Sequence, residues 1–385
     1  MIIGLIGLPQ VGKKTLFELI TGHPAGEHDL AAGKTVLGSA EIADPRFDWL
    51  SQLYQPKKNV RARINVELIP NLIKGFGGNS QILASLNNAE ALCHVVRAFD
   101  NQSVYHVSGS VDPKRDIAEI NGELILNDLM FVEKRLERID KDMKRNKEER
   151  LVKEKELLLR FKDWLDPVRS EHIVDKPTIG NAKSPTHYAS NGVNQSKPLR
   201  LYPFTPEERK NITNSQMITL KEMIVVLNVS EDAVKDQTLV TALEKEYQPI
   251  RIHFMQVSAQ VESEIAKLDS PAERKEFMES VGISEQAIDR LKRVCLKALN
   301  LIPFFTVGKD EVRQWLIKAQ SPAPVAAGAI HTDLEKGFIR AETMKYDELF
   351  ESGNEEKLHA AGKVYVKGKD YIVQDGDILN IRFNV

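Results

Sequence analysis

Short apolar runs recur through the N-terminal two thirds of the chain, separated by amphipathic or polar stretches. Each run has roughly the length of a strand that is buried on both faces. The runs read MIIGLIG, ARINVELI, ALCHVVRAF, MIVVLNV and IRIHFMQVS. Their spacing predicts an α/β domain with a mostly parallel sheet.

A long charged segment from about Asn121 to Leu165 has a different, helical periodicity. Apolar residues recur there at intervals of three and four, which is typical of helices that pack along one face. They are Leu129, Val132, Leu136, Ile139 and Met143, and, after a highly charged middle, Leu158, Phe161 and Leu165. The pattern predicts two antiparallel helices, a coiled-coil hairpin inserted into the α/β domain.

Two further changes of pattern complete the predicted domains. The stretch DKPTIGNAKSPTHYASNGVNQSKP has few apolar residues and predicts a mobile linker. Alternating polar and apolar residues around glycine-containing turns predict a strand-rich domain at the C-terminus. We therefore expect a split nucleotide-binding domain at 1–120 and 215–303, a hairpin plus linker at 121–214, whose stretch 167–200 has no assigned role, and a C-terminal domain at 304–385.

Composition places the chain among ordinary globular proteins and excludes several classes. Hydrophobic residues make up 42%, charged residues 28%, and the formal net charge is -2. Two cysteines, Cys93 and Cys295, are too few for a disulfide scaffold or a cysteine zinc site, and we expect both to be buried thiols. We find no apolar run long enough to span a membrane and no secretory signal, so we expect a cytoplasmic protein with no membrane partner.

The stretch GLPQVGKKT has the form of a phosphate-binding loop between a strand and a helix. Backbone N–H groups of such a loop converge on phosphate at a helix N-terminus, where the helix dipole is positive. Gly7 and Gly12 permit the close approach, and Lys13 supplies a charge between the outer phosphates. The phosphate-binding residues we expect are Gly7, Pro9, Gln10, Val11, Gly12, Lys13, Lys14 and Thr15.

Lys14 stands where this loop normally places the Ser or Thr whose hydroxyl binds magnesium. An ammonium cannot be a ligand of a cation. Two interpretations stay open: Lys14 occupies the metal position, or it turns to solvent and water fills the gap. In either case we expect ATP or ADP, with GTP as the alternative, to be held mainly by backbone amides and Lys13. We expect Mg²⁺ to bind weakly or not at all.

Blocks along almost the whole chain resemble the YchF or Obg-like ATPase family. They are GLPQVGKKTLF, ADPRFDWLSQLYQPKK, HVVRAFDN, VDPKRDIAEINGELILNDL, AAGAIHTDLEKGFIRAE and GKDYIVQDGDILNIRFNV. The resemblance implies a P-loop NTPase domain, an inserted coiled-coil hairpin and a C-terminal ubiquitin-like (β-grasp, TGS) domain. It also implies binding of ATP as well as or better than GTP, slow hydrolysis with magnesium, and association with ribosomes or RNA.

The resemblance places base-binding residues in two further loops. The family's N-x-x-E motif matches Asn228 and Glu231 in VVLNVSED, with Val229 between them, and its second loop matches Ser258 and Ala259. Guanine-specific relatives use N-K-x-D, so the longer Glu231 makes adenine the expected base. Gln260 stands where the family usually has lysine.

Three groups that would hold magnesium and the γ-phosphate in the family differ in this chain. Lys14 replaces a serine, Ala32 falls at the switch-loop threonine, and ELIPNLIKGFGG has no Asp or Gly at the place of an Asp-x-x-Gly turn. Phosphoryl transfer depends on these charge-neutralising groups, so we expect hydrolysis to be very slow or lost, with no catalytic residue assigned. No metal ligand is expected, and Thr35 is the only nearby hydroxyl. The alternative is a rerouted site that uses Thr35, Glu41 or Asp44.

Several other residues have two interpretations. His94 on an apolar strand is better read as a satisfied core histidine than as a base, and His331 fits domain packing or RNA contact. A basic and aromatic set in the C-terminal domain fits either an RNA surface or a solvated face. It comprises Lys336, Arg340, Lys345, Lys363, Lys367, Lys369 and Arg382, with Tyr365, Tyr371 and Phe383.

Three functions remain in view at this point. The first is a nucleotide-binding regulator, expected as a monomer, that engages ribosomal RNA or protein through the hairpin and the C-terminal domain. The second is a slow ATPase or GTPase that cycles on the ribosome. The third, a pocket that holds no nucleotide, is disfavoured by Lys13 and the intact loop.

Overall fold

The structure is a computed structural model that describes residues 1–26, 33–145, 148–166, 196–212 and 216–384. Its contacts divide the chain into two units. One unit, here the N-terminal unit, comprises Ile2–Gly38 and Val66–Ala287. The other, here the C-terminal unit, comprises Met1, Ser39–Asn65 and Ile288–Val385. Most of the predicted linker lies outside the described residues.

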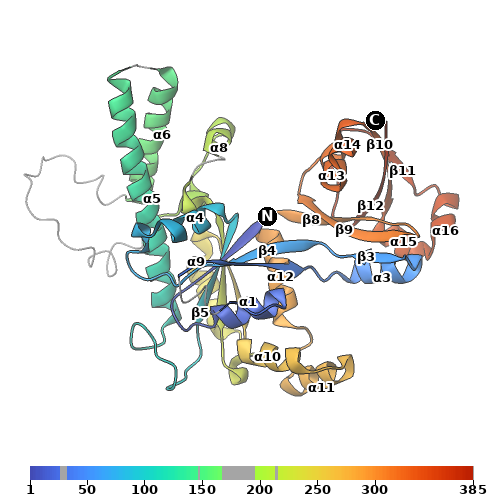
Figure 1. The fold of residues 1–385 in the computed structure, drawn as a ribbon, viewed down its shortest axis with the longest axis horizontal. Coiled ribbons are helices and arrows are strands. Elements are labelled where there is room, and N and C mark those ends of the chain that lie inside the picture. The colour runs from blue at the N-terminus through green and yellow to red at the C-terminus, as the bar shows by residue number, and fades with distance from the viewer. Residues whose placement is uncertain (27–32, 146–147, 167–195, 213–215, 385) are drawn as a thin grey trace, which may run out of the picture. The chain divides into compact units, whose positions relative to one another are not determined.

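A six-stranded sheet with the order β2-β4-β1-β5-β6-β7 organises the first half of the fold (Figure 1). The neighbours β1–β5, β5–β6 and β6–β7 are all parallel, so their carboxyl ends share one edge. Its strands are β1 Ile2–Ile6, β2 Val36–Glu41, β4 Arg63–Leu68, β5 Ala91–Arg97, β6 Glu222–Asn228 and β7 Ile252–Val257. Every residue of β5 is buried, as expected for a central strand covered on both faces. The predicted α/β class is confirmed.

Helices connect these strands, and short 3-10 turns lie between them. The helices are α1 Lys13–Thr21, α4 Ser80–Asn88, α8 Pro206–Ile212, α9 Thr238–Tyr247, α10 Ala259–Lys267, α11 Pro271–Val281 and α12 Ala287–Ala298. The 3-10 turns are Phe76–Gly78, Leu199–Leu201, Ile218–Leu220, Glu231–Ala233 and Gln248–Ile250.

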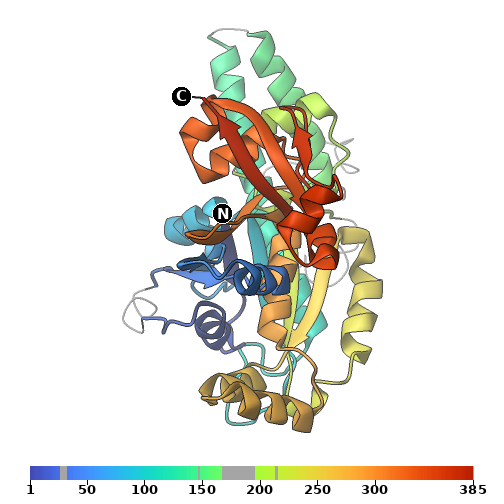
Figure 2. The ribbon, with the colours of Figure 1, turned by 90° about the vertical axis from the view of Figure 1, so that its right-hand side faces the viewer.

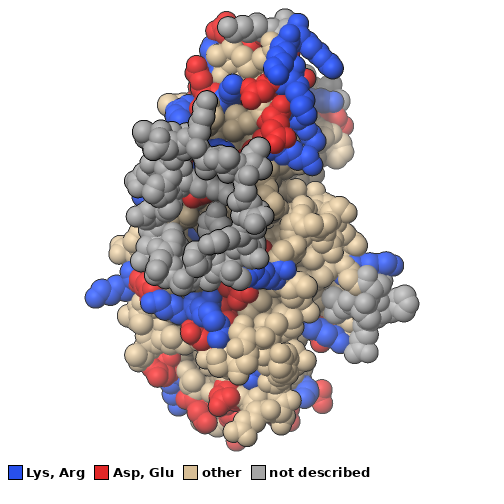
Figure 3. Space-filling view, turned by 90° about the vertical axis from the view of Figure 1, so that its left-hand side faces the viewer, with Lys and Arg blue, Asp and Glu red and all other residues tan. Residues whose placement is uncertain are grey.

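The predicted hairpin is formed by α5 Pro113–Met143 and α6 Glu149–Leu165. Its first helix begins at Pro113, earlier than the periodicity indicated, because Asp112 caps it and Pro113 suits a first helical position. Leu129, Val132, Leu136 and Ile139 share a core with the expected residues of α6. Outside that core Arg135 pairs with Glu154 and Lys155 with Asp140, and Figure 3 shows both signs of charge intermixed over the hairpin.

One buried carboxylate anchors the hairpin to the sheet. Asp128, fully buried, accepts hydrogen bonds from the Ile218 and Thr219 backbone N–H groups, both at 2.7 Å, and from the Thr219 hydroxyl at 2.6 Å. These residues lie just before β6, so the anchor fixes the helix to the chain that enters the sheet.

The C-terminal unit contains a second six-stranded sheet with the order β11-β10-β12-β8-β9-β3 (Figure 2). Strand β8 pairs antiparallel with β9, and the last strand β12 lies parallel to β8, as in a β-grasp fold. Its strands are β3 Lys58–Val60, β8 Leu301–Thr306, β9 Glu311–Lys318, β10 Phe338–Lys345, β11 Tyr365–Lys367 and β12 Asp377–Phe383. Its helices are α3 Pro45–Tyr54, α13 Ala323–Ile330, α14 Thr332–Lys336, α15 Tyr346–Ser352 and α16 Glu355–Ala360.

Residues from the first part of the chain complete this second sheet. Strand β3 pairs parallel with β9, and α3 contributes Phe47 and Leu50 to a core with Phe305 and Val312. The predicted domain boundaries stay a proposal, and the contacts add that Ser39–Asn65 group with the C-terminal unit. Among the described residues, no helix is long and apolar enough to cross a membrane.

Candidate nucleotide site

The loop between β1 and α1 has a backbone that requires its glycines. Gly7 has φ 148° and lies so close to β5 that an added Cβ would be 2.4 Å from the Val95 carbonyl oxygen. Gly12 has φ 95°, and Gln10 also adopts a positive φ of 60°. Side chains rarely adopt such angles, so this part of the loop is held in a specific conformation by its neighbours.

The first turn of α1 offers its N–H groups to a ligand. The helix begins at Lys13, and its N-cap residue Gly12 has no side chain that could accept from them. The first N–H groups of a helix have no carbonyl partner within the helix and attract anions. The residues Gly7 to Thr15 therefore form one loop-to-helix unit, and their role in phosphate binding stays a prediction.

Lys13 is the buried cation of this loop. Its Nζ atom donates to the Gly7 carbonyl at 2.7 Å, and the side chain is 7% exposed. Burial lowers the pKa of Lys13 from 10.5 to about 7. An anionic phosphate placed beside this amine would favour its charged form, so the site is suited to phosphate.

Lys14 points along the helix surface. Its Nζ atom lies 4.0 Å from Oε1 of Glu18, one turn further on, and the side chain is 40% exposed. Such i,i+4 pairs stabilise a helix only weakly. Both interpretations of Lys14 stay predictions; in the structure its side chain lies along α1 toward Glu18. Thr15 beside it is half-buried.

Asn228 at the end of β6 joins three loops. Its Nδ2 donates to the Val11 carbonyl at 3.0 Å, and its Oδ1 accepts from the Ala259 N–H at 3.0 Å. The side chain is 4% exposed, and a Cβ on Gly12 would lie 2.3 Å from Nδ2. Asn228 therefore clamps the phosphate loop to the predicted base-binding loops, a role that the sequence pattern did not reveal.

The remaining predicted base-binding residues surround this clamp. Val229 is buried and donates its N–H to the Val257 carbonyl at 2.9 Å, while Glu231 is exposed. Ser258 caps α10, whose first residue Ala259 holds Asn228. Gln260, at the position of the family's lysine, turns along α10 to Glu264 at 3.3 Å.

The chain after β4 packs apolar groups and backbone against the phosphate loop. The Leu72 N–H donates to the Gly7 carbonyl at 3.2 Å, the same oxygen that Lys13 contacts, and Ile69 and Leu72 are fully buried. Glu67, the last carboxylate of β4, accepts from the Ser85 hydroxyl at 2.7 Å. This segment therefore presents a leucine backbone, with no carboxylate, at the place of an Asp-x-x-Gly turn.

The alternative metal ligands have separate contacts. Thr35 is half-buried, whereas Ala32 lies outside the described residues. Asp44 caps α3 and accepts from Arg46 at 2.9 Å, and Glu41 pairs with Arg63 at 2.5 Å. Both carboxylates are thus already engaged by arginines.

His94 lies in the middle of β5, and the sequence did not indicate that it is close to Lys13. It is 1% exposed, pairs in register with Ile6 of β1, and neither ring nitrogen has a hydrogen-bond partner within the described residues. Burial, and then the charge of Lys13, lowers the pKa of His94 to about 3. His94 is a core histidine, as predicted, but its ring nitrogens lack the hydrogen bonds that a core histidine was expected to make. Its one unusual feature is its proximity to Lys13.

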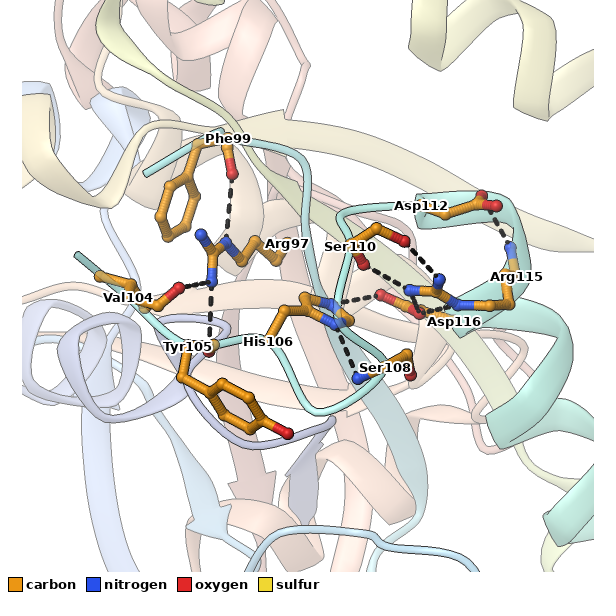
Figure 4. Close-up of polar contacts among 10 residues, drawn as sticks. All are labelled: Arg97, Phe99, Val104, Tyr105, His106, Ser108, Ser110, Asp112, Arg115 and Asp116. Atoms are coloured by element: carbon orange, nitrogen blue, oxygen red, sulfur yellow. Dashed lines mark hydrogen bonds and ion pairs between the residues drawn. The ribbon is translucent and has the colours of Figure 1, made fainter. Parts of the chain in front are cut away.

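A polar network after β5 holds the beginning of α5 (Figure 4). Arg97, fully buried at the end of β5, donates to the carbonyls of Phe99, at 3.1 Å, and Val104, at 3.0 Å. His106 contacts the Asp116 carboxylate at 3.0 Å, and Arg115 brackets the other oxygen of Asp116. Because β5 neighbours β1, this network links the edge of the phosphate site to the first turns of the hairpin.

Comparison with known proteins finds relatives that match along almost the whole chain. The YchF-GTPase_C family model, described as a protein of unknown function, matches residues 301–384. The "Ribosome-binding ATPase YchF" of Bacillus subtilis is 36% identical over 391 residues, covering 99% of each protein. The chain belongs to the YchF/Obg-like ATPase family. "Obg-like ATPase 1" of Oryza sativa subsp. japonica is 33% identical and covers all of this chain and 92% of that protein.

Solved structures support the fold. The structure of the Schizosaccharomyces pombe YchF GTPase matches with a TM-score of 0.79 and 29% identity, over 99% of this chain and 97% of that one. A GTP binding protein from Pyrococcus horikoshii matches with a TM-score of 0.58 at 21% identity. The predicted P-loop fold with a C-terminal β-grasp domain is thereby confirmed.

The basic set predicted in the C-terminal unit is partly neutralised by its own neighbours. Lys345 bonds to the buried Asp377 at 2.6 Å and to the Tyr371 hydroxyl at 2.9 Å, and Arg382 pairs with Glu342 at 2.9 Å. Phe383 remains 45% exposed. The exposed His331 caps α14, its Nδ1 accepting from the Asp333 N–H at 3.2 Å, so its visible role is local packing.

Proposed function

We propose that this chain binds a purine nucleotide, ATP or ADP with GTP as the alternative, and acts as a ribosome- or RNA-associated regulator. The observation that carries the proposal is the uncapped first turn of α1 beside the buried Lys13, with Asn228 clamping the base loops to it. The names of its relatives, ribosome-binding and Obg-like ATPases, support the same function.

Magnesium-dependent hydrolysis is expected to be very slow or absent. Lys14 offers no oxygen to a metal ion and leans toward Glu18, and the segment after β4 brings Leu72 to the loop where a carboxylate would be needed. The loss of one preorganised electrostatic contact typically lowers a rate by about two to three orders of magnitude. Two such losses leave backbone amides and Lys13 as the main phosphate ligands.

Base choice should favour adenine. Glu231 is exposed, and its carboxylate is one methylene further from the backbone than the Asp of guanine-specific relatives. Val229 follows Asn228, so no lysine stem is available to pack on a base there. The exposed position leaves Glu231 free to accept from the exocyclic amine of adenine.

Partner binding is assigned to the hairpin and to the C-terminal unit, with the protein as a monomer. Helices α5 and α6 present exposed charges of both signs, and the C-terminal β-grasp unit carries Arg340 and Lys369 on its surface. Such surfaces suit a mixed RNA and protein partner like the ribosome.

A slow ATPase is the second candidate. The observation in its favour is His94, an unpartnered imidazole within the described core whose pKa responds to Lys13.

Titration of ADP and ATP with and without magnesium tests the proposal. We expect similar affinities in EDTA and in excess Mg²⁺, at least tenfold weaker binding for Lys13→Ala, and unchanged binding in EDTA for the matched variant Lys14→Ala. A large enhancement of nucleotide affinity by Mg²⁺ would contradict the proposal that Lys14 prevents magnesium binding.

Turnover separates the two candidates. We expect no hydrolysis above background for the wild type or for Lys14→Ser, since the segment around Leu72 is unchanged in that variant. Steady turnover by the wild type that His94→Leu abolishes would establish the slow ATPase instead. Co-sedimentation with ribosomes, in the presence and absence of ADP and ATP, tests the partner.

A further inference from the structure

An exposed aromatic cluster lies between α3 and α15 of the C-terminal unit, where the two helices are adjacent in both views (Figures 1 and 2). Trp49 contacts Tyr346 edge to face, with ring centroids 5.6 Å apart, and Phe350 at 5.1 Å. The rings of Tyr346 and Phe350 stack at 5.8 Å. Phe350 is 53% exposed, so much of a large apolar side chain faces water.

The cluster is built on a fixed base. Trp49 and Tyr346 pack against the core that includes Phe47 and Leu349. Tyr346 and Phe350 are one helical turn apart on α15, so their side chains share one face of that helix. An anchored aromatic surface of this kind offers contact area with little loss of side-chain freedom on binding.

A stripe of carboxylates runs directly beside the aromatic rings. Asp347 and Glu351 follow Tyr346 and Phe350 in the sequence, so they form a second i,i+4 pair on the neighbouring face of α15. Both are exposed, and within the described residues neither has an ion-pair partner. Like charges at this spacing repel one another, although Asp347 also lies in the first turn of α15, where a carboxylate is favourable.

The cation Arg46, near the aromatic cluster, is already paired with two carboxylates. Arg46, whose charge acts on Tyr346, contacts Asp44 at 2.9 Å and Asp375 at 2.8 Å. Helix α15, with sequence YDELFES, has three carboxylates and no lysine or arginine. The field at the aromatic cluster is therefore negative.

We propose that the surface formed by Trp49, Tyr346, Phe350, Asp347 and Glu351 binds an arginine- or lysine-rich segment of a partner protein. A guanidinium can lie over the exposed ring of Phe350 and meet the two carboxylates at its edge, which combines cation–π and charge-assisted contacts. Nucleic acid does not fit, because its phosphates would face Asp347 and Glu351. The proposal is independent of the nucleotide site.

The chemistry predicts a preference for arginine. A planar guanidinium stacks on an aromatic ring and pairs with a carboxylate at the same time, whereas an ammonium is a compact point charge. Fluorescein-labelled nona-arginine and nona-lysine are therefore suitable probes, with binding followed by anisotropy on the full-length protein. We expect nona-arginine to bind several-fold more tightly than nona-lysine.

Two variants test the two parts of the surface. Phe350→Ala should weaken nona-arginine about fivefold and remove most of the preference over nona-lysine. The double variant Asp347→Asn/Glu351→Gln should weaken both peptides about tenfold. It relieves the like-charge pair, which offsets the loss of the first-turn carboxylate Asp347, so it should fold about as well as the wild type and the test survives if Phe350→Ala is unstable.

Matched controls in the same unit exclude a general effect of charge or apolar area. Phe383, 45% exposed on β12, and Glu356, exposed on α16, are outside the proposed surface. Phe383→Ala and Glu356→Gln should change peptide affinity less than twofold. Equal effects of the control and test variants would overturn the proposal. So would competition for the surface by a twelve-residue oligouridine whose own binding is lost in Phe350→Ala.

Discussion

Asn228 and Val11, 217 residues apart in the chain, are joined by a hydrogen bond of 3.0 Å between the asparagine amide and the Val11 carbonyl. The same asparagine accepts from the Ala259 N–H, so both functional atoms of its side chain are used within the protein. The loops proposed to hold the base and the phosphates are thus held as one piece. A nucleotide would meet a preorganised site rather than three independent loops.

Replacing Asn228 should weaken nucleotide binding equally for adenine and guanine nucleotides. Asn228→Ala leaves the buried Ala259 N–H and Val11 carbonyl without their partner, which we expect to lower the free energy of unfolding by about 1–3 kcal/mol. ADP affinity, measured by calorimetry, should fall at least tenfold, and GDP affinity by the same factor. Gln260→Ala, on the exposed side of α10, is the control. Selective loss of ADP binding alone would mean that Asn228 reads the base directly.

A side chain at position 12 would collide with Asn228, and this collision can be tested separately from the strain of the backbone angle. In Gly12→Ala the new Cβ would collide with the Asn228 amide, at 2.3 Å, in addition to the strain of φ 95°. Gly22→Ala, with φ 71° and open space around its Cβ, has the backbone strain alone, about 1–2 kcal/mol. We expect Gly12→Ala to lose more stability in urea denaturation, and also to lose ADP binding, which Gly22→Ala should retain. Equal behaviour of the two variants would contradict the collision.

The sequence predicted the local elements of this site and missed the long-range ones. The phosphate loop could be predicted because strand, glycines, lysine and helix are consecutive and their conformations depend on near neighbours. The bonds from Asn228 to Val11 and from Asp128 to Thr219 join distant segments, and no local pattern encodes them.

The same limit explains the C-terminal unit. The strand and helix at Ser39–Asn65 have ordinary local patterns, so nothing in them indicates that β3 pairs with β9, about 250 residues later. The hairpin, by contrast, was predicted because its core repeats every three or four residues within each helix.

Lys13 should couple phosphate binding to proton uptake. Its pKa in the empty protein is about 7, so at pH 8 most of the amine is neutral, and bound phosphate should restore its charge. We expect ADP binding at pH 8 to take up close to one proton, which calorimetry in buffers of different ionisation heat measures. Affinity should then fall as pH rises from about 7 to 10. Lys14→Met is expected to keep the uptake, and identical heats in all buffers would contradict the prediction.

The empty protein should show the matching effect on stability. A lysine whose folded pKa lies below its unfolded value binds fewer protons when folded, so stability rises with pH between about 7 and 10.5. Below pH 7 both states are protonated, and the contribution is constant. Lys13→Met should remove this slope in denaturation curves measured at a series of pH values.

His94 should be replaceable without loss of stability. A buried imidazole without a hydrogen-bond partner within the described residues has lost its contacts with water and gained none, so His94→Leu should leave the free energy of unfolding unchanged or raise it by about 1 kcal/mol. The depressed pKa of about 3 means that the folded protein resists protonation, so the wild type should lose stability as pH falls from about 6.5 to 3. His94→Leu should lack that component, whereas His253→Leu, at an exposed position on β7, should retain it. A marked destabilisation by His94→Leu would contradict this prediction and would show that the ring makes stabilising contacts, with its neighbour Lys13 as the first residue to test.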